Sequence, residues 1–208
     1  MAERLVRSFD VDDTLVDRGR LVRAFGLAVE KARGKTHKTV DLSSVPQNDH
    51  SPQNTRITSI LEKLSLTAHS RRNLIAGVRT ALAQTREGEN PSNNVVNTGR
   101  SNKLEWTQMT IGQFTRLGID PYVQRYTFKP SGMSSTESKL DVIRGFLEDG
   151  NKVEHFEDDP RTALVIAATF PDVTVHLVNH TITGMMIPRT QLAGHSNIHI
   201  VSHIGEGI

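Results

Sequence analysis

The chain has 208 residues, of which 36% are hydrophobic and 23% charged, and it contains no cysteine. This length suits one or two domains with a sizeable core, and the lack of cysteine excludes disulfides, thiolate metal sites and a cysteine nucleophile. The formal net charge is only +2, and no apolar run approaches the roughly 20 residues that span a bilayer. The N-terminus has no signal-peptide pattern, so we expect a soluble, cytoplasmic protein with no membrane partner.

Short apolar runs alternate with amphipathic segments along the chain. The first run, Leu5 to Phe9, is a predicted strand that ends at Asp10. Helical spacing predicts helices over 20–33, 57–64, 74–82, 103–117 and 136–149, and Asp159-Pro160 is a typical helix start. Further strands are predicted over 94–97, 123–128, 152–156, 173–178 and 198–201, with loops over 43–55 and at the TGRS stretch, 98–101.

This alternation predicts parallel βαβ units and therefore an α/β fold with a doubly wound, mostly parallel sheet. Ligands of such sheets bind at the carboxyl ends of the strands.

The charge pattern also varies along the chain, with seven basic residues between Arg18 and Lys38 and eight acidic residues between Glu137 and Asp159. An anionic ligand meeting a cation site would explain both segments, and two solvated faces are the alternative.

Three carboxylates directly follow the first strand, at Asp10, Asp12 and Asp13. Carboxylates beside a buried strand are costly unless a cation compensates them. Asp10 and Asp12 could share a divalent cation, and Mg²⁺ suits a site made only of oxygen ligands. The alternative, turn and N-cap carboxylates, explains any one of the three better than it explains all of them.

Four stretches resemble, in order, the motifs of the haloacid dehalogenase-like superfamily. The first is Phe9-Asp10-Val11-Asp12-Asp13-Thr14-Leu15, and the second is Val95-Val96-Asn97-Thr98-Gly99-Arg100-Ser101. Lys139, near a predicted helix start, resembles the third, and Phe156-Glu157-Asp158-Asp159-Pro160-Arg161 resembles the fourth. The resemblance spans about residues 4–178. It implies a Rossmann-like core of residues 1–17 and 93–208, with 18–92 as a small helical cap or flap whose last helix could belong to the core.

The resemblance also implies an activity, that of a Mg²⁺-dependent phosphatase working through an aspartyl-phosphate. Asp10 would be the nucleophile and Asp12 the general acid and base. Thr98 would bind a phosphate oxygen, and Lys139 would offset negative charge. The substrate would also be contacted by Thr14, Gly99 and Arg100. The metal would be held by Asp10, Asp12, Asp158 and Asp159, with Asp12 acting through its carbonyl and Asp159 either through water or as a partner of the direct ligands.

Two assignments stay open at this point. Lys129 competes with Lys139 for the third motif, and Glu157-Asp158 competes with Asp158-Asp159 as the metal pair. A carboxylate at Asp12 favours phosphatase or phosphotransferase chemistry over the dehalogenase branch, which lacks that acid.

The expected substrate is a small phosphorylated metabolite or a nucleotide, which the basic residues of the insertion would steer towards the site. An alternative is a polynucleotide end-processing phosphatase with a nucleic-acid partner, because residues 101–139 are similar to polynucleotide phosphatases and RNA-repair-like relatives. Trp106 and Phe114 would then stack on bases, although their helical spacing favours core packing. A further alternative is a non-catalytic phosphate-binding scaffold, against which the four intact motifs argue. The late histidines, including His176 and His199, are interpreted as surface or core residues rather than as a metal site.

Overall fold

A single sheet forms the centre of the protein. The structure is a computed structural model that describes residues 4–17, 66–88, 91–178 and 189–208. The strands are β1 (Leu5–Phe9), β2 (Asn93–Ser101), β3 (Arg125–Lys129), β4 (Lys152–Glu157), β5 (Thr174–Val178) and β6 (Ile198–Val201). They are ordered β3-β2-β1-β4-β5-β6, and each neighbouring pair is parallel. The prediction of a doubly wound parallel α/β sheet is confirmed.

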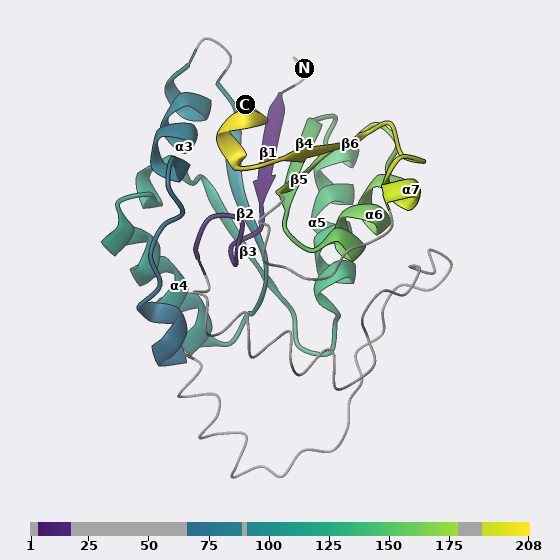
Figure 1. Cartoon of the computed structure of the whole chain (residues 1–208). Helices are drawn as coiled ribbons and strands as arrows, with labels where there is room; N and C mark the ends of the chain where they lie inside the picture. The colour runs from purple at the N-terminus through teal and green to yellow at the C-terminus, as the bar shows by residue number, and fades with distance from the viewer. Residues whose placement is uncertain (1–3, 18–65, 89–90, 179–188) are drawn as a thin grey trace.

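Helices cover both faces of this sheet (Figure 1). One side carries α3 (Val78–Glu87) and α4 (Leu104–Leu117), and the other carries α5 (Ser135–Glu148) and α6 (Pro160–Thr169). The shorter elements are α7 (Arg189–Leu192) and the 3₁₀ turns η1 (Asp120–Tyr122) and η2 (Ile204–Glu206). Residues 66–70, at the start of the second described range, are also helical.

The strands contribute apolar side chains to two cores because both faces of the sheet are covered. Phe9 and Val96 point to the face of α3 and α4, where they join Phe114 in one buried cluster. Their neighbours Val6 and Val95 lie in the other cluster, below α5 and α6. This alternation decides which side of the sheet each polar residue at a strand end faces.

Most element boundaries follow the sequence pattern. β1 and β6 have the predicted bounds, Gly118 ends α4 with a φ of 68°, and Asp159 caps α6. The prediction of a loop at the TGRS stretch is wrong, because β2 continues through Ser101. Ser101 still pairs with Lys129 of β3 after a register shift that follows Thr98, and such long-range pairing cannot be read from local composition.

The predicted insertion is described only at its two flanks. Residues 18–65, which include two predicted helices, the 43–55 loop and the basic segment, lie outside the described residues. The Ile75 N–H donates to the Leu15 carbonyl and the Asp17 N–H donates to the Asn73 carbonyl, both at 3.0 Å. The flanks therefore lie side by side. The predicted helix over 74–82 begins only at Val78, because the residues before it pair with this strand-end loop.

α3, the last helix of the predicted insertion, packs against the sheet at β2. Within the four described ranges, no helix combines the length and the apolar character that crossing a membrane requires.

Candidate active site

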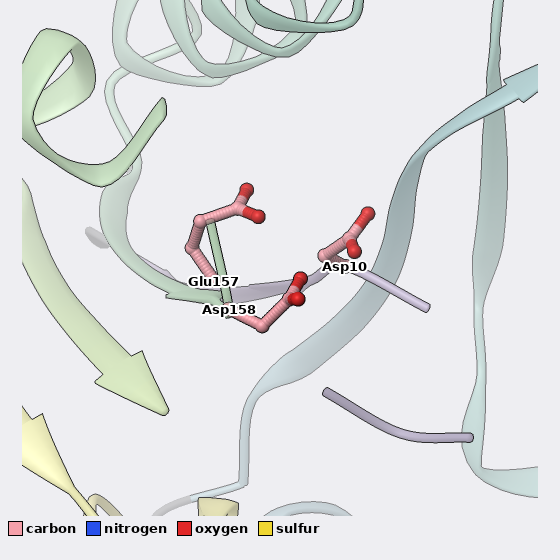
Figure 2. Close-up of side chains that lie close together, drawn as sticks. All are labelled: Asp10, Glu157 and Asp158. Carbon is pink, nitrogen blue, oxygen red and sulfur yellow. The ribbon is translucent and has the colours of Figure 1, made fainter. Parts of the chain in front are cut away.

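The site begins where β1 and β4 end side by side. Phe9 and Phe156 are register partners, and their rings stack at 4.7 Å on the face of α3 and α4. The following residues, Asp10 and Glu157, therefore leave the sheet together, and Asp158 comes next. One carboxylate oxygen from each of these three acids lies within 4.8 Å of the other two. Figure 2 shows the three side chains close together.

Lys139 reaches this group from α5. The helix starts at a capping box, in which the Glu137 N–H donates to Ser134 Oγ while the Glu137 carboxylate accepts from the Ser134 N–H. Lys139 Nζ lies 2.9 Å from Asp10 Oδ1 and 2.6 Å from Glu157 Oε2. Lys129 instead donates to the Met133 carbonyl, at 3.1 Å. The structure thus places Lys139, and not Lys129, beside Asp10.

Burial and charge act against each other in this group. Burial would lower the pKa of Lys139, but the carboxylates of Asp10 and Glu157 outweigh it and raise that pKa, so the ammonium persists. Burial also raises the pKa of Asp10; Lys139 opposes this rise and Glu157 adds to it. The pKa of Glu157 is lowered because Lys139 and His155 outweigh the effect of its burial.

The donor set fits a divalent cation. Asp10, Glu157 and Asp158 bring three carboxylates together against the single ammonium of Lys139. Such a buried excess of negative charge is costly without a further cation. Oxygen-only donors are those that Mg²⁺ prefers.

Asp158 and Asp159, both predicted metal ligands, are placed differently. Asp158 is buried and belongs to the group with Asp10. Asp159 turns towards α6, where it accepts hydrogen bonds from the Arg161 N–H at 3.1 Å and from Thr162 Oγ1 at 2.9 Å. Of the two pairs left open by the sequence, Glu157-Asp158 is therefore the one that lies with Asp10.

The Asp12 side chain points to two arginines. Arg100 Nη2 lies 2.8 Å from Asp12 Oδ1 and Arg100 Nε lies 3.1 Å from Oδ2, while Arg72 Nη1 lies 2.5 Å from Oδ1. Burial would raise the pKa of Asp12, but Arg100, together with His69 and Arg72, outweighs it and holds that pKa well below its ordinary value. Arg72 carries no motif in the sequence and was not among the predicted site residues.

Arg100, predicted to contact substrate, is itself deeply held. It is only 5% exposed, and its Nη1 donates to Thr110 Oγ1 and Gln113 Oε1, both at 3.0 Å. Gln113 also donates to the His69 carbonyl at 2.7 Å. α4 therefore positions Arg100 and also binds the segment that delivers Arg72.

The remaining predicted residues lie around the same strand ends. Thr98 is buried, and its Oγ1 accepts from the Arg100 N–H at 3.2 Å. Gly99 packs so closely on α5 that a Cβ there would lie 2.2 Å from Ser135 Oγ. Thr14 is buried, and its hydroxyl makes no hydrogen bond within the described part of the chain. Their roles towards a substrate stay predictions.

The two aromatic residues considered for base stacking differ in exposure. Phe114, a residue of α4, is fully buried in the core between this helix and the sheet. Trp106 is partly buried, with the His69 ring against it at 5.1 Å between centroids. Phe114 is therefore unavailable to a base, as its helical spacing indicates.

Comparison with known proteins identifies the fold. No family model and no curated protein matches the chain. A haloacid dehalogenase-like hydrolase structure from Bacteroides fragilis, described as putative, matches with a TM-score of 0.60 at 15% identity, covering 99% of this chain and 100% of that one. A structure from Thermotoga maritima described as a putative beta-phosphoglucomutase matches at 0.59 and 16% identity, covering 97% and 95%. A dehalogenase with an intermediate complex matches at 0.60 and 11%, covering 99% and 96%.

The chain has the haloacid dehalogenase-like fold. In this fold the Asp10 group lies at the carboxyl ends of the parallel strands, beside the central β1. The matched structures include hydrolases of more than one kind, and they give no support to a particular relationship with polynucleotide phosphatases.

Proposed function

We propose that this protein is a Mg²⁺-dependent phosphatase that hydrolyses phosphomonoesters through an aspartyl-phosphate on Asp10. The observation that carries the proposal is the position of Lys139, whose ammonium lies between Asp10 and Glu157 beside Asp158. A nucleophilic carboxylate, a fixed cation and a cluster of oxygen ligands are what phosphoryl transfer requires.

The residues suited to hold Mg²⁺ are Asp10 and Asp158, with Glu157 close by. The bound ion would neutralise charge on the phosphate oxygens. Lys139 supplies a second, permanent positive charge from the side of α5.

The two half-reactions use Asp10 and Asp12. An Asp10 oxygen attacks phosphorus, the new O–P bond forms, and the bond to the leaving oxygen breaks while Asp12 donates a proton to that oxygen. Water then attacks the aspartyl-phosphate and gives its proton to Asp12, which returns Asp10 and releases phosphate. Asp12 starts ionised against Arg72 and Arg100, so it has no proton to donate in the resting protein. We propose that the entering phosphomonoester competes for the N–H groups of both arginines, and that the released Asp12 takes up the proton of the phosphate monoanion and then donates it to the leaving oxygen.

The proposed substrate class is a small phosphorylated metabolite or a nucleotide. The burial of Phe114 removes one of the two aromatics that an oligonucleotide would use. Haloacid hydrolysis is the rival within this fold, and the carboxylate at Asp12 favours phosphate chemistry because it supplies the proton that an alcohol leaving group needs.

The test is hydrolysis of p-nitrophenyl phosphate with Mg²⁺ and after chelation. We expect Mg²⁺-dependent turnover that Asp10→Asn abolishes. Asp141→Asn is the matched control, because Asp141 is exposed on α5 and pairs only with Arg144 in the described structure. Halide release from a 2-haloacid without phosphatase activity, or full activity of Asp10→Asn, would refute the proposal. A panel of phosphorylated metabolites, nucleotides and oligonucleotides then ranks the substrates.

A further inference from the structure

A line of buried polar groups runs from Asp10 into the sheet. Lys139 Nζ lies 2.9 Å from Asp10 Oδ1 and 2.6 Å from Glu157 Oε2. The same Glu157 oxygen lies 3.2 Å from His155 Nε2, and His155 Nδ1 lies 3.0 Å from Ser8 Oγ. None of these five residues is more than 6% exposed.

The strand register accounts for this line. Ser8 and His155 are register partners on the adjacent strands β1 and β4. Asp10 and Glu157 follow two residues later, so they leave the strands on the same face of the sheet. Phe9 and Phe156, between them, point to the opposite face and stack there. α5 covers the polar face and supplies Lys139.

The chemistry of the partners sets the direction of each hydrogen bond. Lys139 only donates and an ionised Glu157 only accepts. His155 Nε2 must therefore carry a hydrogen and donate it to Glu157. Nδ1 faces the Ser8 hydroxyl, from which it accepts whenever the ring carries only that one hydrogen. The other Glu157 oxygen accepts from the Asp159 N–H at 3.1 Å. Three donors thus hold the Glu157 carboxylate in one orientation.

This orientation matters for Lys139, which has two carboxylate partners. His155 shares the Glu157 oxygen that Lys139 contacts, so it withdraws part of the negative charge on that oxygen. Without His155, Glu157 would keep only the Lys139 and Asp159 donors. The full charge on its Oε2 would then hold the ammonium more strongly, at the expense of Asp10.

We propose that His155 is a positioning residue for the reaction at Asp10, acting through Glu157 on Lys139. This inference rests on the proposed function. His155 lies outside the four motifs and touches neither substrate nor nucleophile. Its role resembles that of residues which, in metal sites, hydrogen-bond to the direct ligands and so fix their orientation.

Two amide substitutions distinguish the hydrogen bond of His155 Nε2 from that of His155 Nδ1. In His155→Gln the amide nitrogen lies near the place of Nε2 and can still donate to Glu157. In His155→Asn the shorter amide lies near Nδ1 and keeps only the contact with Ser8. We expect kcat for p-nitrophenyl phosphate to fall about 10- to 100-fold in His155→Asn, with KM changed less than about twofold, and His155→Gln to retain most of kcat. Equal activity of the two variants, or equal loss, would overturn the proposal.

Ser8→Ala is the control on the other side of the ring. It keeps the donor to Glu157, so kcat should stay within about threefold of the native value. Urea unfolding measures the stability of every variant separately from its kcat. If His155 has only a structural role, kcat should fall in proportion to the stability lost, in Ser8→Ala as well as in the His155 variants.

The native protein offers a readout that needs no turnover. ¹⁵N-histidine NMR at neutral pH should show an Nε2–H on His155 that exchanges slowly, assigned by its loss in His155→Gln. An Nδ1–H tautomer with a bare Nε2 would overturn the arrangement. If native protein hydrolyses no phosphomonoester, the proposed function fails and the positioning role fails with it. If native protein is active but His155→Asn equals His155→Gln, only the positioning role fails.

Discussion

Arg100 and Asp12, 88 residues apart in the sequence, meet through two parallel hydrogen bonds from one guanidinium to one carboxylate. Arg100 lies near the end of β2, two residues after Thr98. Its guanidinium therefore fixes the position of Asp12, the proposed acid and base of the reaction. The pairing makes Asp12 a structural partner in the resting protein as well as a candidate for proton transfer.

Replacement of Arg100 by glutamine should destabilise the protein by about 2 kcal/mol at neutral pH, because a largely buried carboxylate loses its main partner. The pKa of Asp12 is depressed in the folded protein, so its contribution is present above about pH 4 and is lost as the pH falls further. Urea unfolding at several pH values measures this effect. The difference between Arg100→Gln and native protein should shrink below pH 4, and a constant difference would show that Arg100 does not stabilise the ionised Asp12.

Replacement of Asp158 by asparagine should weaken Mg²⁺ binding, because one of the three clustered carboxylates loses its charge. Asp159→Asn is the matched control: asparagine is also a good N-cap, so α6 keeps its start and Mg²⁺ affinity stays near native. Isothermal titration with Mg²⁺ distinguishes the two variants. A larger loss in Asp159→Asn would restore the assignment of Asp159 as a ligand.

Gly99→Ala should destabilise the protein by about 1–3 kcal/mol, because its Cβ would lie 2.2 Å from Ser135 Oγ and 3.0 Å from Ser135 Cβ. Removing the opposing side chain in Gly99→Ala/Ser135→Gly should recover part of this loss. Gly112→Ala is the control, since Gly112 lies in α4 with open space around its Cβ position, and alanine there should be neutral or stabilising by up to about 1 kcal/mol. Thermal denaturation compares the three variants with native protein. Equal effects of Gly99→Ala and Gly112→Ala would contradict the close approach of Gly99 to Ser135.

His176 should make the protein sensitive to acid. It stacks on Phe156 at 4.4 Å, and neither ring nitrogen has a hydrogen-bond partner among the described residues. Burial lowers the pKa of His176 to about 4. The unfolded chain therefore binds more protons than the folded one between about pH 6.5 and pH 4, so the free energy of unfolding falls as the pH falls through that window.

His176→Phe keeps a ring on Phe156 and removes the titrating group. Native protein should lose about 3 kcal/mol of stability between pH 7 and pH 4 through His176, and the variant should lack this part of the pH dependence. The measurement is the slope of the unfolding free energy with pH. The absolute stability is less informative, because Gly207 lies close to the His176 ring and the larger phenylalanine ring would crowd it. Identical slopes for the two proteins would rule out His176 as the source.

The amino-acid sequence by itself determined the fold class and the places where chemistry was expected. Apolar runs such as Leu5 to Phe9 and helix signals such as Asp159-Pro160 are local, because they depend on side-chain periodicity and on the backbone groups of the next few residues. The order of the polar residues after these elements was equally readable, and parallel strands bring their carboxyl ends to one edge.

Only the tertiary structure decided which of these residues meet. Lys139 rather than Lys129 lies beside Asp10, Asp159 turns away to cap α6, and β2 extends through the stretch that looked like a loop. Arg72 and His155 had no signal in the sequence. Their partners come from the packing of the segment at residues 69–72 on α4 and from the β1–β4 register, and such contacts between distant parts of a chain leave no periodic pattern in it.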